Sequence, residues 1–226
     1  MAVHAEVAPT RTLVETVPAA DPAPLGLAAF ALTTFVLSGH NATFIPDLIW
    51  VGLALFYGGL TQLLAGMWEF RNRNVFGATA FSTYGGFWMS LGIFVSLAVV
   101  SKSFGGALTG ANLPNAVAWF LIAFAIFNTY MLLWSTQVSV AVFLVFATLE
   151  ATEILLAIGN FSEAHGNANN GWVHLGGWVG VATAAVAWYA SAAGVINGMK
   201  GRAVLPVGAP LSFHHSASPM PRGQRA

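Results

Sequence analysis

Six long apolar stretches follow one another along the chain, separated by short polar segments. They cover about residues 25–42, 47–68, 77–100, 115–135, 138–160 and 173–198. Each is near or above the roughly 20 residues that a helix needs to cross about 30 Å of hydrocarbon. Because backbone groups in lipid must be hydrogen-bonded within their own segment, these stretches are predicted to be helices and not strands. The pattern therefore predicts an all-α membrane protein with six transmembrane helices.

The polar segments divide the chain into a membrane domain and two tails. Residues 1–20 lack apolar periodicity and lack the basic and apolar regions of a signal peptide, so we expect a flexible cytoplasmic tail. Residues 21–206 form the predicted transmembrane domain, with a Gly-rich loop at 101–114 and a polar loop at 161–171. Residues 207–226 are rich in Pro, Ser and His and are predicted to be a second flexible cytoplasmic tail.

Positive charge is unevenly distributed among the connections, and cytoplasmic loops of membrane proteins carry the excess of Lys and Arg. With both termini in the cytoplasm, seven of the eight Lys and Arg residues lie inside, and Lys102 alone lies outside. The seven are Arg11, Arg71, Arg73, Lys200, Arg202, Arg222 and Arg225. Both termini are therefore predicted to face the cytoplasm.

Composition supports the membrane class and argues against several others. Only 7% of the residues are charged and 57% are hydrophobic, whereas about a quarter of a soluble domain is charged. The formal net charge of zero gives no argument for a nucleic-acid partner, and the absence of cysteine excludes disulfides and thiolate metal sites. The chain has no Gly-x-Ser-x-Gly, phosphate loop, His-Glu-x-x-His or short metal-ligand spacing. We predict no enzyme activity, cofactor or metal.

Two acids are hard to explain by lipid packing. Glu150 and Glu153 lie three residues apart on one face of the fifth predicted helix, where a charge costs roughly 2.5–3.5 kcal/mol. Such a pair is a candidate proton site or a filter for permeating anions, or else a pair of hydrogen-bonded structural acids. We expect Glu150, nearer mid-span, to be largely protonated, and Glu153 to be hydrated and ionised.

Histidine and asparagine gather at the predicted outer ends of the helices. His40 ends the first helix and His174 begins the sixth, with Asn41 and Asn160 at the same level. Imidazole and amide groups at a pore mouth could attract carboxylates and titrate near neutral pH. Simple polar caps of helix ends are the alternative interpretation.

The stretch that begins the first helix carries a specific resemblance. Pro22 to Leu27 match the signature Asn-Pro-Ala-Pro-Leu-Gly-Leu of the acetate uptake transporter family, with Asp21 in place of the Asn. The chain resembles these small membrane proteins, which include the bacterial succinate–acetate permeases, over about residues 21–208. The resemblance continues through Phe56-Tyr57-Gly58-Gly59, Ala65-Gly66, Glu69, Thr79-Ala80-Phe81, Tyr84-Gly85, Phe87-Trp88, Ala157-Ile158-Gly159-Asn160, Gly177-Trp178 and Leu205-Pro206.

The resemblance also implies a pore. Three positions match the residues that form a narrow apolar constriction in family members, and they are Phe30, Tyr84 and Leu149. Such constrictions can gate by dewetting and widening. Three further residues offer neutral hydrogen-bond donors for a carboxylate, and they are Thr33, Thr34 and Gln62. Hydrogen bonding between helices is the alternative role for them. The resemblance further implies a homo-hexamer in which each subunit holds its own pore.

The function implied is transport of acetate and other short monocarboxylates across the plasma (inner) membrane, linked to protons, with succinate as a further candidate substrate. Ammonium or a small neutral solute is an alternative cargo. A membrane sensor or interaction protein without transport is the alternative from another class. A channel and a proton-coupled transporter are both consistent with this sequence, because both need the same narrow apolar pore.

Overall fold

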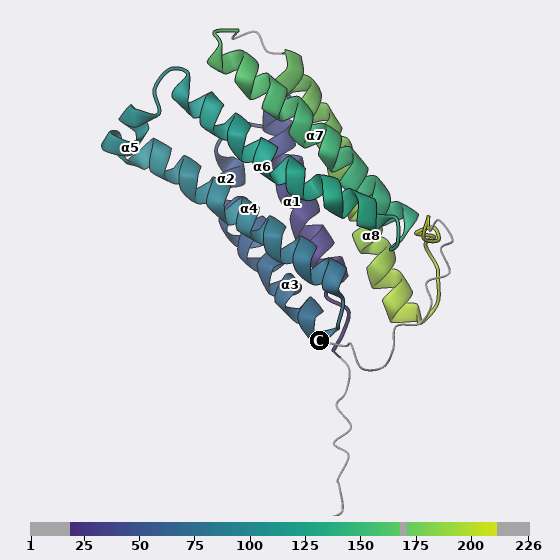
Figure 1. Ribbon diagram of the computed structural model, residues 1–226. Coiled ribbons are helices and arrows are strands. Elements are labelled where there is room, and N and C mark those ends of the chain that lie inside the picture. The colour runs from purple at the N-terminus through teal and green to yellow at the C-terminus, as the bar shows by residue number, and fades with distance from the viewer. Residues whose placement is uncertain (1–18, 168–170, 212–226) are drawn as a thin grey trace, which may run out of the picture.

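The computed structural model describes residues 19–167 and 171–211, which form helices and no strand (Figure 1). Six segments in this part of the chain are long and apolar enough to cross a membrane. They are α1 (Ala23–Asn41), the continuous run of α2 (Ile49–Leu55), η1 (Phe56–Thr61) and α3 (Gln62–Arg71), then α4 (Val75–Val100), α6 (Asn112–Ser135), α7 (Val140–Ala164) and α8 (Gly171–Lys200). The prediction of an all-α protein with six spans is confirmed.

Two connections expected to be loops contain helix instead. The short helix α5 (Lys102–Ala107) follows α4, and the Ser101 Oγ caps it by accepting a hydrogen bond from the Phe104 amide at 3.2 Å. Helix α7 continues to Ala164, so it takes the first residues of the segment predicted as the 161–171 loop. Residues 168–170 of that segment lie outside the described residues.

The second span is interrupted by a single π-helical turn, η1. Its Gly58 faces α1 so closely that an added Cβ atom would lie 2.6 Å from Oγ1 of Thr33. The missing side chain therefore lets η1 and α1 approach each other. A π-helical turn inside an α-helix changes the face that the following residues present, and such turns are frequent at functional sites.

Helix α1 runs through the middle of the bundle, with α2, α3 and α4 on one side and α6, α7 and α8 on the other (Figure 1). Its most extensive packing is against α8, which in turn packs against α7. At Gly180 of α8, an added Cβ would lie 2.2 Å from Oγ of Ser38 on α1. Small residues on α8 thus allow the close helix contact that membrane helices use in place of a hydrophobic driving force.

The two ends of the bundle differ in charge. The turn after α3 and the end of α8 lie at the same end as the start of α1, because successive spans alternate in direction. This end, called here the basic end, carries Arg71, Arg73, Lys200 and Arg202, whereas Lys102 follows α4 at the opposite end. Arg11, Arg222 and Arg225 lie outside the described residues. The orientation in the membrane remains a prediction.

The segment after α8 folds back onto the turn between α6 and α7. The carbonyl of Val207 accepts a hydrogen bond from the Ala141 amide at 2.9 Å, and the Leu211 amide donates to the Thr136 carbonyl at 2.7 Å. These bonds satisfy groups that helix ends leave free. Residues 207–211 of the expected flexible tail are therefore hydrogen-bonded to the bundle, while residues 1–18 and 212–226 lie outside the described residues.

Candidate functional site

Two cavities lie inside the bundle, one toward each end, and the same three side chains border both. The large cavity has a volume of about 340 Å³ and the small cavity about 80 Å³. Within the described part of the chain, the residues that line both are Phe30, Tyr84 and Leu149 and no others. These side chains are 4%, 3% and 7% exposed. They therefore separate one cavity from the other with buried, largely apolar groups, and these three side chains are called the barrier below.

The three side chains come from three helices that converge at this level. Phe30 lies on α1, Tyr84 on α4 and Leu149 on α7. The rings of Phe30 and Tyr84 meet edge to face, with their centroids 5.8 Å apart. This is a favoured geometry for an aromatic pair. Moving any of the three helices would therefore change the width of the barrier.

The large cavity extends from these three side chains to the end of the bundle opposite the basic end. Its polar lining near the opening comes from His40, Asn41, Asp47, Asn160 and Glu163. Between the opening and the barrier its walls are mainly apolar and aromatic. A small solute that enters would pass from polar groups into a region with few hydrogen-bond partners.

The small cavity lies between the barrier and the basic end. It reaches the first turn of α1 at Ala23, the α3–α4 turn at Asn74 and the α6–α7 turn at Val138. Its polar lining residues are Gln62 and Asn74 among mostly apolar neighbours. Oε1 of the buried Gln62 has no hydrogen-bond partner among the described residues, so it can accept a bond from a solute.

A hydrogen-bonded cluster ties the barrier to α6 and α7. The Tyr84 hydroxyl lies 2.9 Å from Oδ1 of Asn128 and 3.3 Å from Oε1 of Glu153. The Nδ2 group of Asn128 donates to the Phe146 carbonyl at 3.0 Å and to Oε2 of Glu150 at 2.7 Å. The barrier is therefore apolar on its surface and held by polar bonds behind it.

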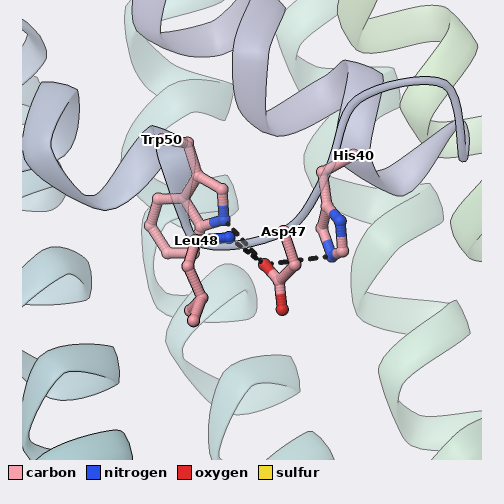
Figure 2. Close-up of polar contacts among 4 residues, drawn as sticks. All are labelled: His40, Asp47, Leu48 and Trp50. Atoms are coloured by element: carbon pink, nitrogen blue, oxygen red, sulfur yellow. Dashed lines mark hydrogen bonds and ion pairs between the residues drawn. The ribbon is translucent and has the colours of Figure 1, made fainter.

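The mouth of the large cavity is organised by Asp47. Its Oδ1 accepts hydrogen bonds from the Leu48 amide at 2.6 Å and from Nε1 of Trp50 at 3.2 Å, and it lies 3.4 Å from Nε2 of His40 (Figure 2). Leu48 has a φ of 66°, a left-handed conformation that costs energy for a bulky residue. The carboxylate therefore stabilises a strained turn and fixes Trp50, whose side chain forms part of the cavity wall.

Most of the predicted substrate-binding residues line a cavity, but two do not. Thr34, His40, Asn41 and Asn160 line the large cavity, and Gln62 lines the small one. Thr33 lies instead against Gly58 of η1, so it faces a helix contact. His174 is exposed on α8 with its ring centroid 6.4 Å from that of Trp178, and it lines neither cavity. Thr33 and His174 are therefore not placed to contact a solute in either cavity.

The two glutamates differ in burial, and Glu153, which was expected to be hydrated, is the more deeply buried of the pair. Glu153 is 2% exposed and lines the large cavity, whereas Glu150 is only partly buried and lines neither cavity. Glu150 instead accepts hydrogen bonds from Asn128 and, at 2.8 Å, from the Thr129 hydroxyl of α6. A helix that is apolar on every side does not reveal which of two neighbouring positions faces a cavity.

Two buried polar residues escaped the sequence-based site prediction. Asn128 is fully buried in the middle of α6, and a polar side chain within a membrane span is itself a signal of function. Glu69 is also fully buried, near the start of α4, where an added Cβ on Gly77 would lie 2.7 Å from its Oε1. A carboxylate is favourable at a helix N-terminus. Among the described residues, no cluster of three or more His, Asp or Glu side chains could hold a metal ion.

Comparison with known proteins identifies related chains. The sequence model of the GPR1/FUN34/yaaH family matches residues 4–210. The succinate-acetate/proton symporter SatP of Escherichia coli K12 is 36% identical over 190 residues, which cover 84% of this chain and 95% of that protein. Ammonia transport outward protein 2 of Saccharomyces cerevisiae is 40% identical over 181 residues, 78% of this chain and 61% of that protein.

A solved structure shares the architecture. The structure of the bacterial acetate channel SatP matches with a TM-score of 0.74 and 34% sequence identity, covering 84% of this chain and 99% of that one. The chain spans about three fifths of the length of the yeast relatives it matches. The resemblance expected from the sequence is confirmed for the family and for the fold.

Proposed function

The chain belongs to the GPR1/FUN34/yaaH family, and from this premise we propose that it carries acetate and other short monocarboxylates, linked to protons, across the plasma membrane. The observation that carries the proposal is the arrangement of two cavities that meet at three buried side chains. It is a path through one subunit, interrupted at one level. The related symporter is named for succinate, acetate and protons, and the related solved structure for acetate.

In this proposal Phe30, Tyr84 and Leu149 form the constriction of the path. Their supporting features are their burial and their place on three different helices. An apolar constriction excludes hydrated ions until it widens, and it passes a small carboxylate most easily when a proton or a hydrogen-bond donor offsets the charge. This physical requirement favours proton-linked movement over movement of the bare anion.

The polar residues of the two cavities would guide the carboxylate to the constriction. Asn41 and Asn160 at the mouth and Thr34 deeper in the large cavity can each offer a donor. On the other side, Gln62 lines the small cavity, where its amide nitrogen can donate to a carboxylate and its Oε1, unpaired among the described residues, can accept from a protonated one. With both termini cytoplasmic, the large cavity opens to the outside and the small cavity to the inside.

We also propose that the chain forms a homo-hexamer with one path in each subunit. Both cavities are lined by residues of a single chain, so no partner is needed to complete the path. Many large apolar side chains face outward, including Trp119, Ile126 and Leu133 of α6. These faces are available for lipid or for neighbouring subunits.

The test is protein-dependent uptake of radiolabelled acetate into proteoliposomes, with protein-free liposomes measuring leakage of acetic acid through the lipid. We expect acetate flux above that background, and accumulation against the acetate gradient when an imposed pH difference drives a symporter. Downhill flux without accumulation identifies a channel. Absence of protein-dependent flux supports the alternative of a membrane sensor or interaction protein.

Ammonium is a second candidate cargo, because one yeast relative is named for ammonia transport. The same proteoliposomes loaded with radiolabelled methylammonium distinguish the two. Acetate flux without methylammonium flux supports the carboxylate assignment. Methylammonium flux without acetate flux would replace the carboxylate assignment with ammonium.

A further inference from the structure

The orientation of the Asn128 side-chain amide is fixed by its neighbours. Its Nδ2 group lies 3.0 Å from the main-chain carbonyl of Phe146, and a carbonyl oxygen can only accept a hydrogen bond. The amide nitrogen must therefore face α7, and the amide oxygen must face Tyr84. The short contact between Nδ2 and Oε2 of Glu150 agrees with this orientation.

This orientation decides where the single hydrogen of the Tyr84 hydroxyl points. The hydroxyl has two oxygen neighbours, Oδ1 of Asn128 at 2.9 Å and Oε1 of Glu153 at 3.3 Å. Oδ1 of Asn128 has no hydrogen of its own, so the shorter contact takes the Tyr84 hydrogen. The contact between Tyr84 and Glu153 is then left without a hydrogen unless Glu153 supplies it.

A carboxyl group that must donate a hydrogen bond is a protonated one. An ionised Glu153 would hold its negative oxygen against a hydroxyl oxygen that has no hydrogen to offer. A protonated Glu153 instead donates to Tyr84, which donates to Asn128, which donates to Phe146 and Glu150. Every member of this chain then has a donor facing an acceptor, as buried polar networks require.

We propose that Glu153 is a neutral carboxylic acid that donates a hydrogen bond to the permeating carboxylate at the constriction, and that Asn128 is the positioning residue that keeps it neutral. The inference rests on the proposed function. Glu153 lines the large cavity beside the constriction, and its Oε2 has no hydrogen-bond partner among the described residues. When a carboxylate arrives, the Glu153 carboxyl group rotates by half a turn and its two oxygens exchange places. The Glu153 hydrogen that pointed at Tyr84 then points at the permeating carboxylate. The proton stays on Glu153 throughout.

The charge of this group would select the cargo. A neutral acid offers a donor to acetate, whereas an ionised glutamate at the same place would repel acetate and attract cations such as ammonium. The other titratable groups near it are few. Tyr84 from α4 and Glu150 from α7 are its neighbours, and His40, Asp47 and Glu163 line the same cavity nearer its mouth. From α6 and α8, no titratable side chain among the described residues lines the large cavity.

The test measures radiolabelled acetate exchange in proteoliposomes that hold the full chain, at equal pH on both sides, over a series of pH values. In the wild-type protein we expect flux to fall by about tenfold per pH unit once Glu153 loses its proton. Glu153→Gln keeps a donor at every pH, so its flux should fall less steeply at alkaline pH than the wild-type flux does. Glu150→Gln is the comparison on the same helix: it keeps an ionisable group at position 153, so its flux should still fall at alkaline pH.

Asn128→Leu tests the positioning role. Without the Asn128 oxygen, the Tyr84 hydrogen is free to bond an ionised Glu153, so the pH of half-maximal flux should move down by about one unit. If Asn128→Leu does not fold, Glu153→Gln decides alone. Wild-type flux with an unchanged profile in Glu153→Gln overturns the inference and leaves the proposed function standing. Absence of wild-type flux overturns both.

Discussion

The hydroxyl of Tyr84 donates a hydrogen bond to Oδ1 of Asn128 over 2.9 Å, so a side chain that borders both cavities is tied to the middle of α6. The Asn128 amide in turn donates to the Phe146 carbonyl on α7, one turn before Leu149. One buried asparagine therefore links the Tyr84 side chain to the turn of α7 that leads to Leu149. A movement of α6 relative to α7 would therefore alter the hydrogen bonds that position the Tyr84 side chain.

Leu149→Ala should widen the constriction and admit larger carboxylates. The change removes three carbon atoms from a side chain that borders both cavities. We expect the ratio of lactate or succinate flux to acetate flux to rise by about tenfold, the effect of a small change in pocket volume. Leu144→Ala, on the exposed face of α7, is the control and should leave the ratio unchanged. An unaltered substrate range in folded Leu149→Ala would remove this residue from the path.

Asp21→Asn should be tolerated, because it restores the family signature and keeps the contact that the acid makes. Oδ1 of Asp21 accepts a hydrogen bond from the Ala23 amide at 2.9 Å, and an asparagine oxygen can do the same. Asp21→Ala loses this bond and should lower the free energy of unfolding by about 1 kcal/mol. Thermal unfolding in detergent compares the two variants. Loss of transport in a stable Asp21→Asn protein would reveal a role for the negative charge itself.

Gly180→Ala should destabilise the bundle at the contact between α1 and α8. An added Cβ would lie 2.2 Å from Oγ of the buried Ser38, and overpacking of this kind costs about 1–3 kcal/mol. Gly198→Ala on the same helix is the control, because nothing lies within 4 Å of an added Cβ there. Alanine should stabilise that helical position by up to about 1 kcal/mol. Equal melting temperatures for the two variants would contradict the packing described for Gly180.

Asp47→Ala should loosen the mouth of the large cavity, whereas Asp47→Asn should preserve it. Both the Leu48 amide and Nε1 of Trp50 donate to the same carboxylate oxygen. We expect Asp47→Ala to lower the free energy of unfolding by about 1–3 kcal/mol, since both donors lose their acceptor. Leu48→Gly should partly restore stability, because glycine adopts the observed positive φ without strain. Failure of the glycine to compensate would mean that the turn relaxes once the acid is gone.

The six spans were predictable from sequence because membrane thickness sets the length of an apolar segment, whatever the packing. The path was not. Asn128 lies next to Thr129 in a mainly apolar stretch of α6 and belongs to no motif, so its place behind Tyr84 emerged only from the structure. Glu150 and Glu153 could not be ranked by burial, since their helix is apolar all round. Residues 207–211 have the composition of a free tail, yet they bond to the ends of α6 and α7.

The most direct test of the proposed path uses the absence of cysteine from the chain. Leu149→Cys introduces one thiol at the constriction, and Leu144→Cys introduces one on the exposed face of the same helix. Acetate flux into proteoliposomes is measured before and after treatment with a small methanethiosulfonate reagent. The account predicts that the reagent stops flux through Leu149→Cys, that excess acetate slows this block, and that Leu144→Cys is unaffected. Full flux through a Leu149→Cys protein that mass spectrometry shows to be modified would contradict it.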